Sequence, residues 1–254
     1  MTDKPESGSP FKDHFSGHAR HYAAHRPGYP AELFDFLAAE CRARDLVWDC
    51  ATGNGQAARS LASRFRRVVA TDASAEQIAK AEPAEGVDFY VAPAEASALP
   101  AGSVDLVTVA QALHWFNIER FFEEADRVLK PGGLLACWSY HHCRVEPAID
   151  ELIESVFAEV EHFWPPETAI VVNRYRDIIL PFHEIAAGPF SMTIGWSAED
   201  LSNYMKTWSA SRRYLAEQGS DPVEEYAEEL RRRWGTSVRD VVWPLIVRVG
   251  RKSG

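Results

Sequence analysis

The chain has 254 residues, of which 46% are hydrophobic and 25% are charged, a composition typical of a globular protein. Its formal net charge of −10 argues against a broad basic face for nucleic-acid backbones. The opening stretch MTDKPESGSP lacks the apolar core of a signal peptide, and no apolar run approaches the roughly 18 residues of a membrane helix. We therefore expect a cytoplasmic protein that binds neither nucleic acid nor membrane.

The N-terminal segment is polar and carries an unusual histidine pattern. Residues 1–10 predict disorder, and residues 11–28 predict a helix. His14, His18, His21 and His25 are spaced four, three and four residues apart, so on a helix they form one stripe. An i, i+4 histidine pair can bind zinc, but no acidic or cysteine ligand accompanies this stripe. We expect the polar face of a lid helix here and no metal.

From residue 29 onward, short apolar runs alternate with helical patterns. A helix follows Pro30, and Asn117 is placed to cap another helix. The predicted strands are 46–50, 67–72, 87–92, 103–113 and 134–140. Buried strands that alternate with helices indicate an α/β fold, with a parallel sheet covered on both faces.

After residue 141 the alternation is diluted by helical segments. Pro147 begins a predicted helix, Ser197 and Asp200 form a capping-box pattern, and Gly235 ends a further helix. Residues 184–196 and 241–250 predict strands, and a proline inside the second of these indicates a sheet edge or a bulge. We expect a single domain over residues 11–254, with helical cap insertions at about 141–180 and 198–236.

The stretch LVWDCATGNGQAARSLA, residues 46–62, predicts the ligand site. Gly53, Gly55 and Ala58 give a weak dinucleotide-like G-x-G-x-x-A turn, and Asp72 ends the next strand, where an acid can bind ribose hydroxyls. These features suit NAD or another adenosyl ligand. Asp49 precedes the turn, and its charge would repel a pyrophosphate but attract a cation. S-adenosylmethionine carries an ammonium and a sulfonium and no phosphate.

The order of motifs over residues 45–140 resembles the class I S-adenosylmethionine-dependent methyltransferases. The turn after the first strand, the acid after the second, PAEASALP, SVDLVTVAQALHW and RVLKPGGLLACWSY all have counterparts there. The chain departs from the family pattern at Ala51, in place of the first glycine, and at Pro93, where an Asp is often found. The resemblance implies a seven-stranded Rossmann-like sheet of order 3-2-1-4-5-7-6 with an antiparallel last strand.

The resemblance also implies which residues bind the cofactor and the methyl acceptor. The implied cofactor-binding residues are Tyr22, Arg26, Asp49, Ala51, Gly53, Gly55, Asp72, Ala73, Gln77, Ala94, Glu95 and Gln111. We expect the substrate pocket to contain His114, Trp115, Trp138 and Tyr140. His114 is the catalytic candidate because it follows the fourth strand, at the edge where open α/β sheets bind ligands. Further aromatic residues and four arginines are candidates for the acceptor site: His141, Trp164, Trp196, Tyr204 and Trp208, with Arg174, Arg176, Arg212 and Arg213.

A finer resemblance, in HYAAHRPGYP, HWF, TWSASRRYL and WPLIVRVGR, points to the trans-aconitate methyltransferase-like group, which methylates small molecules. It implies O-methylation of a small-molecule carboxylate, which needs no base because it is already ionised. Three alternatives stay open: a hydroxyl acceptor with His114 as base, an NAD-dependent oxidoreductase, and a cofactor-binding protein without catalysis. A metal site of His141, His142 and Cys143 lacks an evident fourth ligand, and the four cysteines are expected to be reduced.

Overall fold

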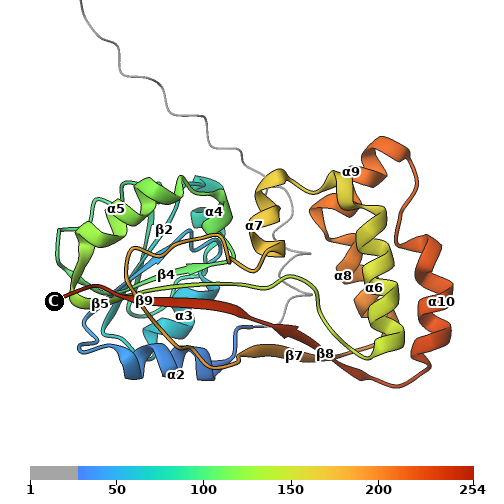
Figure 1. The fold of residues 1–254 in the computed structure, drawn as a ribbon, viewed down its shortest axis with the longest axis horizontal. Helices are drawn as coiled ribbons and strands as arrows, with labels where there is room; N and C mark the ends of the chain where they lie inside the picture. Colours follow the sequence, from blue (N-terminus) through green and yellow to red (C-terminus); the bar gives the residue numbers. More distant parts are fainter. Residues whose placement is uncertain (1–27) are drawn as a thin grey trace, which may run out of the picture.

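The computed structural model describes residues 28–254 (Figure 1). Several predictions fall on the preceding segment and lie outside the described residues. They are the disordered start, the lid helix with its histidine stripe, and the cofactor contacts of Tyr22 and Arg26.

A seven-stranded sheet forms the centre of the fold, in the order β3-β2-β1-β4-β5-β9-β6. Its strands are β1 (Leu46–Cys50), β2 (Arg67–Asp72), β3 (Val87–Val91), β4 (Val104–Ala110), β5 (Leu129–Ser139), β6 (His183–Ile185) and β9 (Ile246–Arg251). The strands from β3 to β5 pair in parallel, and β9 runs antiparallel to β5 and β6. The predicted α/β class and sheet order are confirmed.

Helices cover both faces of this sheet, because successive strand residues point to opposite sides. On one face, Val47 of β1 packs with α2 (Ala31–Glu40) and α3 (Gln56–Ala62). On the other face, Trp48 packs with α5 (Ile118–Val128). The predicted N-cap of α5 is present, since the Asn117 side chain accepts from the backbone N–H of Arg120. The short helix α4 (Ala75–Lys80) follows β2.

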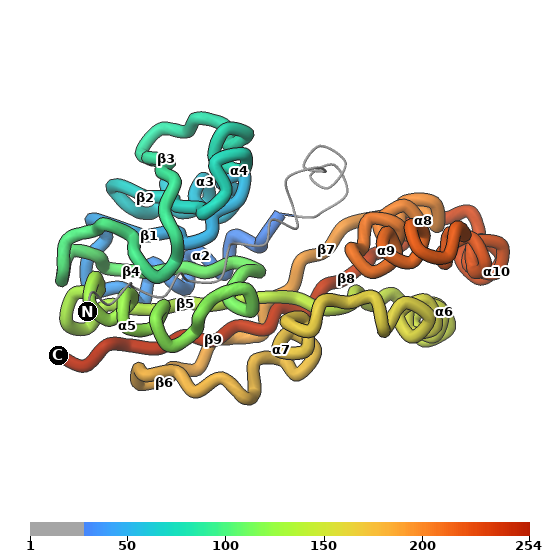
Figure 2. The backbone as a smooth tube through the Cα atoms, turned by 90° about the horizontal axis from the view of Figure 1, so that it is seen from above, coloured from blue at the N-terminus to red at the C-terminus, as the bar shows by residue number. Residues whose placement is uncertain are grey.

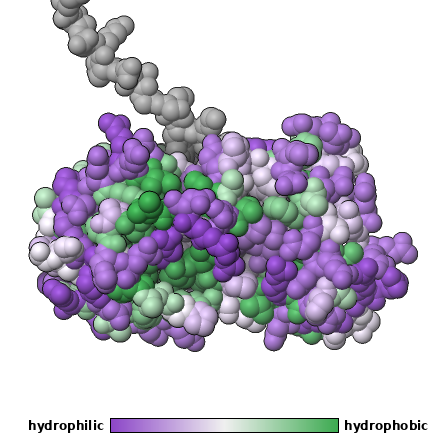
Figure 3. Space-filling model, in the orientation of Figure 1, coloured by the Kyte–Doolittle hydropathy of each residue, from purple (hydrophilic) through white to green (hydrophobic). Residues whose placement is uncertain are grey.

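The remaining helices gather beyond one end of the sheet (Figure 2). They are α6 (Pro147–Glu159), α8 (Ala198–Lys206), α9 (Ser209–Gln218) and α10 (Glu224–Trp234), and α7 (Ala169–Val172) lies between them and the sheet (Figure 1). A second sheet of β7 (Ser191–Trp196) and β8 (Arg239–Pro244) connects the two parts. On the face shown in Figure 3, apolar side chains gather over the part with the large sheet, and hydrophilic residues cover most of the rest.

Two predicted strands are each divided between the two sheets. Residues 184–196 form β6 and β7, separated by a segment that contains Gly188 and Pro189. Residues 241–250 form β8 and β9, which meet at Pro244. Proline has no backbone N–H to continue a ladder, so each proline marks the place where the chain leaves one sheet for the other. None of the helices that the structure describes is long and apolar enough to cross a membrane.

Candidate active site

A cavity of about 1370 Å³ runs from the carboxyl ends of β1, β2 and β4 to the helical part of the molecule. Open parallel sheets bind ligands at this edge, beside the point where the strand order reverses. Single-ligand pockets usually have volumes of about 300–1000 Å³. The cavity is therefore large enough for two ligands that meet inside it.

The turn after β1 brings backbone to the first end of the cavity. Ala51, Gly53 and Gly55 all have positive φ angles, of 54°, 57° and 83°. At Gly55 this φ angle strains any other residue, and a Cβ would lie only 2.8 Å from the Phe89 ring, so glycine is strongly favoured there. Ala51 holds a left-handed conformation at a cost of about 1–2 kcal/mol. Such strain is typical of a segment that is shaped around a ligand.

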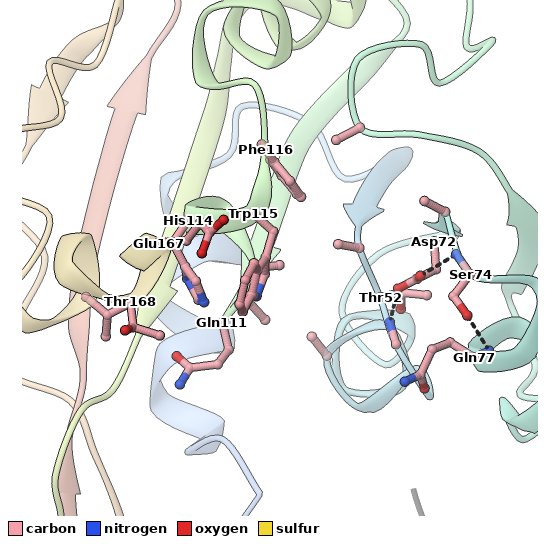
Figure 4. A pocket seen from close by; sticks show the side chains of 18 of the residues that line it. Thr52, Asp72, Ser74, Gln77, Gln111, His114, Trp115, Phe116, Glu167 and Thr168 are labelled. Carbon is pink, nitrogen blue, oxygen red and sulfur yellow. Dashed lines mark hydrogen bonds between the residues drawn. The ribbon is translucent and has the colours of Figure 1, made fainter. Parts of the chain in front are cut away.

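Asp72 connects this turn to the end of β2. Its Oδ2 accepts from the backbone N–H of Gly53 at 2.9 Å, and its Oδ1 accepts from that of Ser74 at 2.8 Å (Figure 4). The side chain is 9% exposed and lines the cavity. A carboxylate has about four acceptor positions, so Asp72 can bind ligand hydroxyls beside these two contacts.

Asp49 lies beneath the turn and is fully buried. The hydroxyls of Thr52 and Thr108 donate to its two oxygens at 2.6 and 2.7 Å. Burial raises the pKa of Asp49 to about 6, although these hydrogen bonds oppose the rise. At neutral pH the carboxylate is therefore mainly ionised. It places a negative charge behind the cavity wall, which favours a cationic ligand.

Gln111 connects the ends of β4 and β5. Its side-chain amide donates to the carbonyl of Tyr140 at 3.1 Å and accepts from the backbone N–H of the same residue at 3.0 Å. The φ angle of Gln111 is 55°, so after Ala51 it is the second non-glycine residue of the cavity lining with a left-handed conformation. Gln111 thus holds the strand ends together at the middle of the cavity.

His114 follows β4 in a short 3₁₀ turn, Leu113–Trp115, and is 8% exposed. Burial lowers its pKa to about 4, and the charge of Glu167, which lies beside it, partly opposes the shift (Figure 4). Its Nδ1 is buried and has no hydrogen-bond partner among the described residues. At neutral pH, His114 is an uncharged imidazole that can orient a ligand by hydrogen bonding.

Aromatic rings form the far end of the cavity, on the side of the helical part. The residues that line it there include Tyr140, His141, His142, Phe157, Trp164, Tyr204, Trp208 and Arg212. Burial lowers the pKa of His141 to about 4 and that of His142 to about 3, with Arg144 contributing to both shifts. These imidazoles are neutral, so the far end is mostly apolar with a few polar groups.

The structure brings most of the predicted site residues together. Eight of the predicted cofactor-binding residues line the cavity: Ala51, Gly53, Asp72, Ala73, Gln77, Ala94, Glu95 and Gln111. Asp49 and Gly55 lie behind its wall. Among the predicted pocket residues, His114, Trp115 and Tyr140 line the cavity.

Trp138 departs from the prediction. It is fully buried in the core, with its ring centroid 5.5 Å from that of Tyr29 and 6.0 Å from that of Phe34. Side chains alternate along β5, and Trp138 points to the face that α2 covers. Trp196 is likewise a core residue, packed 5.0 Å from Trp243.

Of the four candidate arginines, Arg212 lines the cavity, and Arg213 donates instead to the carbonyl of Phe163 at 3.3 Å. Arg174 and Arg176 lie outside the lining. Glu167 and Thr52 line the cavity and were missed by the sequence reasoning. Glu167 carries no local signal, because it reaches the site from a segment more than 50 residues after His114.

No cluster of three histidine, cysteine or acidic side chains that could hold a metal ion is found within residues 28–254. The three neighbours considered for such a site have other surroundings. Cys143 is fully buried, and the rings of His141 and His142 lie against Phe157. All four cysteines are unpaired thiols.

Comparison with known proteins identifies relatives over the whole chain. A family model described as a methyltransferase domain matches residues 48–137. A Dictyostelium discoideum protein named as a methyltransferase is 32% identical over 263 residues, which cover all of both chains. A structure named as a type II methyltransferase from Anaeromyxobacter dehalogenans is 38% identical, covers 90% of this chain and 99% of its own, and has a TM-score of 0.86.

A more distant structure, the phosphoethanolamine N-methyltransferase 2 of Haemonchus contortus, was solved with S-adenosyl-L-methionine. It is 15% identical, covers 94% of this chain and 58% of its own, and has a TM-score of 0.50. At this identity the likeness concerns the fold alone.

Proposed function

The chain belongs to the class I S-adenosylmethionine-dependent methyltransferases, and on that premise we propose that it methylates the carboxylate of a small molecule bound at the His114 end of the cavity. S-adenosylmethionine would supply an electrophilic methyl group. A carboxylate oxygen would form the new C–O bond in line with the S–CH3 bond that breaks, and S-adenosylhomocysteine would leave. The protein's part is to bind both molecules in line and to exclude water.

The fit of the first cavity end to this cofactor supports the proposal. Asp72 would accept hydrogen bonds from ribose hydroxyls, while the backbone of Ala51 and Gly53 comes close to the ligand. Asp49 would stabilise the positive charges of the methionine part from behind the wall. The strained Ala51 and the strongly favoured Gly55 are explained if the turn is shaped for this ligand.

The observation that favours a carboxylate acceptor is that His114 is uncharged at neutral pH. Burial lowers its pKa to about 4, and a general base works best when its pKa lies near the operating pH. A carboxylate needs no base, because it is ionised at neutral pH. His114 would then donate a hydrogen bond that orients the carboxylate, and Arg212 would add positive charge to the same cavity.

Glu167 favours a second candidate, methylation of a hydroxyl. Its carboxylate lies beside His114 (Figure 4) and raises the basicity of the imidazole. If binding brought the two into hydrogen-bond contact, His114 could remove the hydroxyl proton with Glu167 as its partner. The same negative charge would repel an acceptor carboxylate. The two candidates therefore differ in what Glu167 does.

The test compares Glu167→Gln and His114→Ala with the wild type on a panel of carboxylic acids and phenols, with products identified by mass spectrometry. We expect methyl esters, an unchanged kcat in Glu167→Gln, and a 5- to 150-fold loss of kcat/KM in His114→Ala, partly through KM. The exposed His162 lies outside the cavity lining, so His162→Ala is the matched control and should keep full activity.

Methyl ethers as products, with kcat lowered 10²- to 10⁴-fold in His114→Ala and lowered in Glu167→Gln, would establish the hydroxyl candidate instead. Binding of S-adenosylmethionine without turnover of any acceptor would favour a cofactor-binding protein that does not catalyse.

A further inference from the structure

Five aromatic rings form a continuous surface at the far end of the cavity. The Phe157 ring lies 5.6 Å from that of Trp164, which lies 5.9 Å from that of Trp208. The rings of His141 and His142 pack at 5.0 and 4.2 Å from Phe157. All five residues line the cavity. Rings at these separations offer faces and edges on which another flat ring can pack.

Two polar atoms of this aromatic subsite are buried without a partner. Nε1 of Trp164 and Nε2 of His141 have no hydrogen bond among the described residues. An indole N–H can only donate, so Trp164 requires an acceptor atom. A buried donor that lacks one costs about 1–3 kcal/mol. A ligand oxygen at this end would remove that cost if the two rings turn their nitrogens toward the cavity when the ligand binds.

The aromatic subsite and His114 are carried by different parts of the fold. His114 follows β4 at the sheet edge, whereas Phe157 belongs to α6, and Trp208 precedes α9 in the helical part (Figure 1). An acceptor that touches both ends must therefore extend from its methylated group toward the helices.

We propose that the aromatic subsite of His141, His142, Phe157, Trp164 and Trp208 selects flat aromatic acids that carry a hydrogen-bond-accepting oxygen at the end remote from the carboxylate. The ring packs among the aromatic side chains, and the remote oxygen accepts from Trp164 and from His141 in its Nε2–H form. This inference rests on the proposed carboxylate methylation.

The test measures binding by calorimetry to protein saturated with S-adenosylhomocysteine, so that no turnover is needed. The probes are 4-hydroxycinnamate, cinnamate and 3-cyclohexylpropanoate, with 4-hydroxybenzoate and benzoate as a shorter pair. Within the pair of acids whose length fits the cavity, we expect the hydroxylated acid to bind about 10-fold more tightly than the acid without the hydroxyl. We expect cinnamate to bind more tightly than the saturated acid.

Two variants test the assigned atoms. Trp164→Phe and His141→Phe keep a ring but remove the nitrogens, so each should reduce the ratio of the affinities for 4-hydroxycinnamate and cinnamate measured in the same variant. Trp196→Phe, in the core outside the cavity, is the matched control and should keep the preference. Folding of each variant is checked by its stabilisation with S-adenosylhomocysteine.

Equal affinities for hydroxylated and unsubstituted acids, a preference that survives in both variants, or no binding of any aromatic acid would overturn the proposal. The two proposals fail differently. Preferential binding without any methyl ester as product contradicts carboxylate methylation and leaves the aromatic subsite standing. Formation of a methyl ester without a preference for hydroxylated acids contradicts the aromatic subsite and leaves carboxylate methylation standing.

Discussion

At the scale of single residues, Asp49 shows how a buried charge is kept at the expense of stability. Its pKa of about 6 in the folded protein lies above the usual 3.8. The folded state therefore binds this proton more tightly than the unfolded state, and stability is lost as the pH rises from about 4 through 6. On the proposed function, the field of this carboxylate offsets that loss by stabilising the positive charges of the cofactor.

Asp49→Asn removes that ionisation. The variant should be about 2 kcal/mol more stable than the wild type at pH 8, and the difference should shrink as the pH falls to 4. Urea unfolding at both pH values measures it, with Asp88→Asn, in an exposed ion pair with Arg67, as the control. A difference that does not change with pH would contradict the buried, ionised state. Binding of S-adenosylmethionine should weaken in the variant.

Asp72 holds the turn after β1 and is proposed to bind the cofactor, so the substitution must keep its shape. Asp72→Asn preserves an acceptor for Gly53 or Ser74 but loses the charge that strengthens hydrogen bonds to ribose hydroxyls. We expect 10- to 150-fold weaker binding of S-adenosylhomocysteine, equivalent to about 1.5–3 kcal/mol. Calorimetry measures it. Unchanged affinity in a folded variant would remove Asp72 from the cofactor site.

At the scale of elements, the capping box of α8 anchors a helix that lines the cavity. The Ser197 hydroxyl accepts from the backbone N–H of Asp200 at 3.3 Å, and the Asp200 carboxylate accepts from that of Ser197 at 2.9 Å. Ser197→Ala should lower the free energy of unfolding by about 1 kcal/mol. Thermal unfolding measures this, with the exposed Ser191→Ala as control. Equal losses in both variants would show that the cap itself contributes nothing.

Local signals of this kind are what the sequence reveals reliably. The caps at Asn117 and Ser197, the turn at Gly55 and the strand order could be predicted, because each depends on neighbouring residues or on motifs in a fixed order. The contacts between segments that are distant in the sequence could not be predicted. Nothing near Trp138 shows that its side chain packs under α2 and does not reach the cavity, and nothing near Glu167 shows that its segment returns to His114.

At the scale of the whole molecule, ligand binding should stabilise the fold by mass action. A ligand at 100 times its Kd adds about 2.7 kcal/mol. For a domain of this size, that raises Tm by roughly 5–10 °C. We expect this shift with S-adenosylhomocysteine and none with NAD at the same concentration, as measured by thermal unfolding. A shift with NAD alone would contradict the assignment of the cavity to a cofactor without phosphate.

The position of β9 has a consequence for synthesis. This strand is the last in the described chain, yet it lies between β5 and β6 in the large sheet. As the chain leaves the ribosome, β6 emerges more than 60 residues before the strand that will pair with it. The edge of β5 stays open for longer, because β5 ends more than 100 residues before β9 begins. A nascent chain can form the parallel half early, but it closes the sheet only after residues 246–251 have emerged. Until then, the open β5 edge is where a growing chain is most exposed to wrong pairing.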